Sequence, residues 1–137
     1  MSVIPRNGEM RAGKPVVGVL IVEDSWNVAL SLKGIVEQAG ARAIGPVPTV
    51  REALRVVETQ PIALALVDMN LKDHFADPLV DVLIARNIPY AIITAYDALP
   101  TDADRAAIDR MNKPLDHARI SALIAAFTGN QPGKSIA

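Results

Sequence analysis

The sequence predicts an α/β fold in which a five-stranded parallel sheet carries helices on both faces. Five short apolar runs alternate with segments in which apolar residues recur every three or four positions. Buried parallel strands are continuous apolar runs, and their alternation with helices is typical of parallel sheets. The chain has 137 residues, of which 50% are hydrophobic and 21% charged, and this suits one domain with a full core.

The first strand and helix are predicted from residues 16–22 and the stretch that follows. Residues 16–22 form an apolar run rich in β-branched side chains, as in a strand buried on both faces. The helix is expected to begin near Ser25 or Trp26 and to end at Gly40, because glycine commonly ends helices. The residues expected to face the core are Val28, Leu32, Ile35, Val36 and Ala39.

The second strand and helix follow directly. Residues 41–45 predict a short strand, and two prolines separate it from the next helix. Thr49 is expected to cap a helix over residues 50–58, and Glu52, three positions later, completes a capping box. The residues expected to face the core are Ala53, Leu54 and Val57.

A third strand is predicted from Pro61 to Asp68. The helix after it is expected to have Asp77 as its cap and Pro78 in its first position. The residues of this helix that are expected to face the core are Leu79, Val82 and Leu83. A fourth strand is predicted to start at Pro89.

The last part of the chain predicts a fifth strand and a final helix. Residues 97–107 are expected to form a loop or a short mobile helix, and residues 108–111 the strand. Asp116 is expected to cap a helix that runs to Phe127. Its apolar stripe, which we expect the core to account for fully, is Ile120, Leu123, Ile124 and Phe127.

Composition and patterning bound the domain and its surroundings. Residues 1–14 and 129–137 are predicted to be flexible tails around one domain over 15–128. The 14 basic and 15 acidic residues are nearly balanced, so we expect no nucleic-acid partner. The chain has no cysteine, no secretory signal and no stretch long enough to cross a bilayer, so we expect a cytoplasmic protein without membrane contact.

Polar side chains close four of the apolar runs. Glu23 and Asp24 follow the first, Asp68 the third, Thr94 the fourth and Lys113 the fifth. In parallel sheets, ligands bind beyond the carboxyl ends of the strands, where the strand order reverses. With the order 2-1-3-4-5 of a flavodoxin-like (βα)5 three-layer sandwich, the order reverses between the first and third strands, which carry the acids.

Three converging carboxylates repel one another unless a cation lies between them. Oxygen ligands suit Mg2+, which can share its remaining positions with a phosphate. A carboxylate such as Asp68 can then act as a nucleophile toward phosphorus. Lys113 and the Thr94 hydroxyl are suited to hold phosphoryl oxygens. The sequence therefore predicts phosphoryl transfer to Asp68.

This pattern resembles the receiver domain of bacterial response regulators over about residues 16–127. The resemblance implies that Asp68 is the phosphoacceptor and that Thr94 is the switch hydroxyl. It implies that Lys113 contacts the phosphoryl group and has a cis bond to Pro114. The magnesium ligands that it implies are Asp24 directly, Glu23 largely through water, Asp68, and the backbone carbonyl of Asn70.

Residues 88–96 are similar to the Pro-Phe-x-Phe-Ala-Thr-Gly-Tyr signature of the "FATGUY" receivers of alphaproteobacteria. Ala95 replaces the signature glycine, and two isoleucines replace Phe-Ala. The resemblance implies a stand-alone receiver that is phosphorylated by a histidine kinase of the HWE or a related type, or by a histidine phosphotransfer protein.

One residue departs from the family pattern. Most receivers carry tyrosine or phenylalanine three residues before the active-site lysine, where this chain has Arg110. The resemblance therefore implies an interrupted aromatic relay. Tyr96 is expected either to take over some of that role or to cover the phosphoryl group, so that Tyr96→Ala would speed dephosphorylation.

We therefore expect a phosphoacceptor signalling protein, not an enzyme, whose output is contact with an effector protein of unknown identity. A switch, a phosphate shuttle and a phosphate sink all remain open. The alternative is an interaction module that works without phosphorylation. A phosphohydrolase would usually carry a second aspartate where Asn70 stands, and a nucleotide-binding flavodoxin-like protein would have a glycine-rich loop after the first strand.

Several polar and aromatic residues are expected to lie at the protein surface or at the rim of the site. Glu23 is expected to be the more solvated of the two adjacent acids, and Trp26 a rim residue near them. His74 and His117 are expected to be surface residues, and Arg110 a solvated residue at the edge of the sheet.

Overall fold

The computed structural model describes residues 10–11, 14–15, 17–69, 71, 76–94 and 106–128. In this part of the chain, five parallel strands form one sheet in the order β4-β3-β5-β6-β7. In chain order this is 2-1-3-4-5, so the predicted fold class is confirmed. The strands are β3 (Gly18–Val22), β4 (Arg42–Val47), β5 (Leu64–Asp68), β6 (Tyr90–Thr94) and β7 (Asp109–Asn112).

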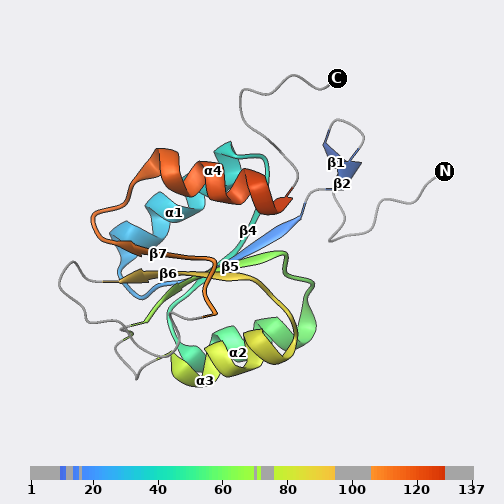
Figure 1. Ribbon diagram of the computed structural model, residues 1–137, viewed down its shortest axis with the longest axis vertical. Coiled ribbons are helices and arrows are strands. Elements are labelled where there is room, and N and C mark those ends of the chain that lie inside the picture. Colours follow the sequence, from blue (N-terminus) through green and yellow to red (C-terminus); the bar gives the residue numbers. More distant parts are fainter. Residues whose placement is uncertain are drawn as a thin grey trace.

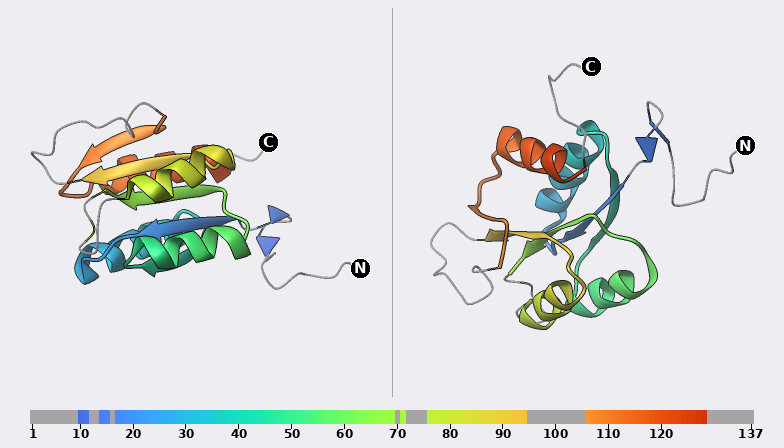
Figure 2. Two further views of the ribbon diagram at one scale, coloured as in Figure 1. Left: turned by 90° about the horizontal axis from the view of Figure 1, so that it is seen from below. Right: turned by 45° about the vertical axis from the view of Figure 1, so that its right-hand side comes forward.

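The helices form a layer on each face of the sheet. Figure 1 shows α1 and α4 on one face and α2 and α3 on the other, and the turned views in Figure 2 agree. The helices are α1 (Trp26–Gln38), α2 (Val50–Thr59), α3 (Asp77–Ala85) and α4 (His117–Thr128). A short antiparallel pair, β1 (Met10–Arg11) with β2 (Lys14–Pro15), lies within the stretch predicted as a tail and at its border.

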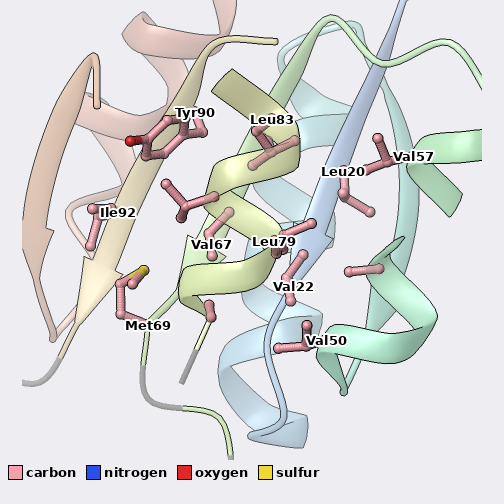
Figure 3. Close-up of a cluster of buried hydrophobic side chains, with 14 of the residues drawn as sticks. Leu20, Val22, Val50, Val57, Val67, Met69, Leu79, Leu83, Tyr90 and Ile92 are labelled. Carbon is pink, nitrogen blue, oxygen red and sulfur yellow. The ribbon is translucent and has the colours of Figure 1, made fainter. Parts of the chain in front are cut away.

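Alternate residues of the central strands supply the two halves of the core. Leu20, Val22 and Val67 pack under α2 and α3, whereas Ile21 and Leu66 pack under α1 and α4. Figure 3 shows the first group meeting Val50 and Val57 of α2 and Leu79 and Leu83 of α3. Because β3, β5 and β6 are buried on both faces, polar side chains belong on these three strands only at their ends.

Local signals in the sequence set most helix ends. The Thr49 hydroxyl accepts the Glu52 N–H at 3.1 Å, and the Asp116 carboxylate accepts the Arg119 N–H at 3.1 Å, so both predicted caps are confirmed. Gly40 follows α1 with φ 89°, a left-handed conformation that glycine adopts without strain.

Two predictions about helices are wrong. Asp77 is the first residue of α3 and not its cap, because Ala76 is fully buried and its carbonyl accepts the Val80 N–H at 3.0 Å. The helix thus starts one residue earlier, at a point fixed by the core. Phe127 is 40% exposed although Ile124, one turn earlier, is fully buried, so the core ends before α4 does.

The second strand is longer than predicted. It continues through Pro46 to Val47, which is possible because β4 is an edge strand and proline needs no partner on its free side. The predicted loop or helix over residues 97–107 lies almost entirely outside the described residues. Of the helices that the structure describes, none combines the length and the apolar character needed to cross a bilayer.

Candidate functional site

The predicted acidic residues meet at the carboxyl ends of the central strands. Glu23 and Asp24 directly follow β3, and Asp68 is the last residue of β5. Val22 is paired with Val67, and Asp68 with Ile93, so these chain ends lie side by side. This is the point at which the strand order reverses, as the sequence predicted.

Glu23, Asp24 and Asp68 form an acidic cluster. One carboxylate oxygen from each lies within 4.8 Å of the others. Glu23 is only 2% exposed and Asp68 3% exposed, whereas Asp24 is half-buried. The expectation that Glu23 is the more solvated acid is therefore wrong.

Backbone groups explain the burial of Glu23. Its carboxylate oxygen Oε2 accepts the Ser25 N–H at 3.0 Å, and its own N–H donates to the Val47 carbonyl at 3.0 Å. These two bonds fix both ends of the residue at the sheet edge. Backbone groups have no sequence signature, so the pattern of side chains could not identify Ser25 and Val47 as supports of the site.

Lys113 supplies the positive charge of the site. Its Nζ lies 3.1 Å from Glu23 Oε1 and 3.5 Å from Asp68 Oδ2. The residue follows β7, and its backbone N–H donates to the Thr94 carbonyl at 2.8 Å. The peptide bond to Pro114 is cis, as the resemblance implied.

The pKa values of both Glu23 and Lys113 are raised in the site. Burial raises the pKa of Glu23, and repulsion from Asp68 raises it further, against the lowering effects of the Ser25 N–H and the Lys113 amine. Burial alone would lower the pKa of Lys113, but the carboxylates of Asp68 and Glu23 more than offset this, and the pKa is raised. Lys113 is therefore firmly protonated near neutral pH.

The donor set fits Mg2+. Three carboxylates and one ammonium leave two net negative charges when all four groups are ionised, which a divalent cation would balance. The cluster offers oxygen atoms alone, which are the ligands that Mg2+ prefers. Glu23, Asp24 and Asp68 are the described residues that would hold the ion.

Thr94 lies on β6, the strand beside that of Asp68, and Arg110 lies on β7, the edge strand beyond it. Thr94, the last residue of β6, is 3% exposed and pairs with Asn112 of β7. Arg110 is half-buried on β7, and its guanidinium donates to the Asn112 side chain at 3.2 Å. Arg110 therefore lies on an edge strand, as expected, but its side chain is less solvated than expected.

The remaining candidates divide into two groups. Trp26 is 70% exposed in the first turn of α1, and His117 is exposed at the start of α4, as expected for a rim residue and a surface residue. Asn70, His74 and Tyr96 lie outside the described residues, and their roles stay predictions.

Part of the chain is similar in sequence to a response regulator. Over 81 residues, which are 56% of this chain, it is 36% identical to the response regulator protein PilR of Pseudomonas aeruginosa. The match spans 18% of that protein. No protein-family model matches the chain.

Solved structures of receiver domains share this fold. A CheY-like response regulator receiver domain from Methylobacillus flagellatus matches with a TM-score of 0.73 and 24% identity, covering 82% of this chain and 98% of that one. The receiver domain of a sensor histidine kinase from Pseudomonas aeruginosa, which has a magnesium ion coordinated in its active-site cleft, matches with a TM-score of 0.72 and 23% identity. That match covers 83% of this chain and 97% of the other.

Proposed function

We propose that this chain, which has the fold of CheY-like response regulator receiver domains, accepts a phosphoryl group on Asp68 as part of a two-component phosphorelay. The observation that carries the proposal is the setting of Asp68. Its carboxylate is almost fully buried at a strand end, beside two further carboxylates and 3.5 Å from the Lys113 amine. Burial of so many charges in one place is costly unless it serves binding or chemistry.

The side chains divide the work of phosphoryl transfer. An Asp68 carboxylate oxygen bonds to phosphorus while the bond from phosphorus to the donor's nitrogen breaks, and the electron pair of that bond stays with the donor. Lys113 then pairs with a phosphoryl oxygen, and the Thr94 hydroxyl donates to another. When bound, Mg2+ would neutralise negative charge on the phosphoryl oxygens.

The donor is proposed to be a histidine kinase or a histidine phosphotransfer protein. A cavity of about 320 Å³ beside Lys113, between α1 and the start of α4, offers a partner access next to the site. Trp26 and Leu30 of α1 are 70% and 43% exposed and supply apolar surface for such a contact. The HWE kinase type and the FATGUY subgroup rest on the sequence resemblance alone and stay predictions.

Output is proposed to be contact with an effector protein, and the chain itself to be a phosphoacceptor without catalytic turnover. Hydrolysis of the phosphoryl group on Asp68 would then regenerate the starting protein. Multiple-turnover hydrolysis of phosphoesters would contradict this part of the proposal.

Labelling by a small acyl phosphate tests the assignment of Asp68 directly. Wild type, Asp68→Ala and the control Asp81→Ala, an exposed acid on α3, are incubated with acetyl phosphate and Mg2+. Intact-mass spectrometry then counts added phosphoryl groups, and hydroxylamine treatment identifies an acyl phosphate. We expect one hydroxylamine-sensitive group on wild type and on Asp81→Ala, and none on Asp68→Ala.

Two outcomes would overturn the proposal. Labelling of Asp68→Ala at the wild-type level would show that a residue other than Asp68 accepts the phosphoryl group. A wild-type protein that takes no label from acetyl phosphate or from histidine kinases, while it still binds Mg2+, would favour an interaction module that works without phosphorylation.

A further inference from the structure

A groove at the edge of the sheet farthest from Lys113 has no part in the proposed phosphorylation. It lies where the edge strand β4 ends and α2 begins, and its volume is about 540 Å³. This is within the range of small-ligand and peptide sites. Its apolar lining comes from Pro46, Val47, Pro48 and Val56.

Two arginines of α2, Arg51 and Arg55, also line the groove. Both are exposed, and no ion pair or hydrogen bond within the described part of the chain engages either guanidinium. The other arginines whose side chains the structure describes all donate to a protein acceptor. These are Arg42 to Gln60, Arg86 to Val57, Arg110 to Asn112 and Arg119 to Asp109.

The spacing of the two arginines places their positive charges close together. Residues four apart lie on the same side of a helix, so Arg51 and Arg55 repel each other and weaken α2. The N-terminus of α2, where Arg51 lies, adds a partial positive charge. Glu52 lines the same groove and offsets one of the two charges, so the groove has a net positive charge on a chain whose net charge is -1.

We propose that this groove binds a short acidic segment of a partner protein. Carboxylates of the segment pair with Arg51 and Arg55, and an aliphatic side chain between them packs against Pro46, Pro48 and Val56. The site is separate from Asp68 and goes beyond the proposed phosphorylation. The apolar lining favours a peptide over a nucleic acid, because the groove has no aromatic side chain on which bases could stack.

Nuclear magnetic resonance titration with a defined probe tests the groove. The probe is the peptide acetyl-Glu-Asp-Leu-Glu-Asp-amide, added to the full chain labelled with nitrogen-15. We expect the amide signals of Val47, Arg51 and Val56 to shift, with a dissociation constant of about 1 mM or tighter. The Asp68→Ala protein cannot be phosphorylated at the proposed acceptor but should bind the probe at least as well as wild type, so a failure of the groove proposal can be distinguished from a failure of the phosphorylation proposal.

Matched variants and probes identify the contacts. The double variant Arg51→Glu with Arg55→Glu should weaken binding at least tenfold while its amide spectrum stays that of a folded protein. The control Lys33→Glu, which removes a positive charge from α1, should bind like wild type. A probe with Ala in place of Leu, and a neutral probe with Gln and Asn in place of the acids, should each bind more weakly.

Four results with the peptide probes would overturn the proposal. They are an absence of shifts around the groove, equal binding of the neutral probe, equal binding of the probe that lacks leucine, and equal weakening by Lys33→Glu. A ten-residue oligothymidylate that shifts the same amides at lower concentration would assign the groove to nucleic acid and would equally refute the peptide site.

Discussion

Glu23→Gln is expected to stabilise the protein in the absence of Mg2+ while it weakens the metal site. The glutamine keeps the shape of the side chain and an oxygen that can accept the Ser25 N–H, which lies 3.0 Å from Glu23 Oε2. What it removes is a negative charge that is 2% exposed and close to two other carboxylates. The sign and size of the effect follow from the Coulombic interactions of this charge and from its desolvation.

The Coulombic terms are the interactions of Glu23 with Asp68, Lys113 and Asp24, and burial of the carboxylate adds a desolvation term. At an effective dielectric constant of about 20, Asp68 repels Glu23 by at least about 3.5 kcal/mol, because their carboxylate oxygens lie within 4.8 Å of each other, and Lys113 attracts Glu23 by about 5 kcal/mol at 3.1 Å. Asp24 adds a weaker, solvent-screened repulsion, so the Coulombic terms nearly cancel. Burial of the carboxylate, at several kcal/mol per ion, then decides the sign. The raised pKa of Glu23, with burial as its largest cause, agrees.

The pH dependence of this effect has a definite direction. Between the ordinary pKa of 4.5 and the raised pKa of Glu23, the folded wild type binds more protons than the unfolded chain, so its stability falls as the pH rises. We therefore expect Glu23→Gln to be more stable than wild type by about 1–2 kcal/mol at pH 7. The difference in stability should vanish below pH 4.5, where the Glu23 carboxyl is protonated in both the folded and the unfolded wild type.

Urea unfolding in EDTA, at pH 4 and pH 7, measures the two free energies. Glu37→Gln, an exposed glutamate on α1, is the matched control and should stay within about 0.5 kcal/mol of wild type. In 10 mM Mg2+ the gap should close, because an ion bound with a dissociation constant of about 1 mM stabilises the wild type by about 1.4 kcal/mol. A Glu23→Gln protein that is less stable than wild type at pH 7 in EDTA would refute the reasoning.

Three further substitutions test single contacts by the same unfolding measurement. Thr49→Ala, which loses the cap to Glu52, should cost about 1 kcal/mol, and an unchanged stability would mean that the cap adds nothing. Gly18→Ala should cost about 1–3 kcal/mol, because its new methyl group would overlap Ile44 Cδ1 and come within 3.3 Å of a backbone oxygen. Lys113→Met should cost about 2 kcal/mol in EDTA, because two carboxylates lose their counter-charge. It should also gain more stability from 10 mM Mg2+ than the wild type does, and a smaller gain would contradict this.

The sequence predicted the fold because its signals are local. Apolar runs separated by caps such as Thr49 and Asp116 determine where strands and helices lie, and the parallel arrangement then follows from their alternation. The same logic placed Asp68 and the other acids at one edge. It failed at Asp77 and Phe127, where the start of a helix and the exposure of its last turn depend on how far the core extends.

The burial of Glu23 could not be predicted for a similar reason. Its supports are the N–H of Ser25 and the carbonyl of Val47, and Val47 lies 24 positions away on a neighbouring strand. Two adjacent acids at a strand end look alike in the sequence. The backbone geometry decides that Glu23 turns inward toward Lys113 while Asp24 stays half-buried.

The bond between Glu23 and Val47 also joins the acidic cluster to the groove beside α2. Val47 lines the groove, and its carbonyl holds the backbone of Glu23 at 3.0 Å. An acidic peptide in the groove would be repelled by the cluster, and a divalent cation on the cluster would relieve that repulsion. We therefore expect Mg2+ to tighten binding of the acidic probe, by about fivefold or less because solvent ions screen the two sites from each other.

Linkage requires the probe to tighten Mg2+ binding by the same factor. Titrating each ligand at saturating and zero concentrations of the other measures both factors. Positive coupling that disappears in Glu23→Gln would place the connection at the cluster. Coupling of the opposite sign would show that the hydrogen bond between Val47 and Glu23, and not electrostatic repulsion, determines how each ligand changes the affinity for the other.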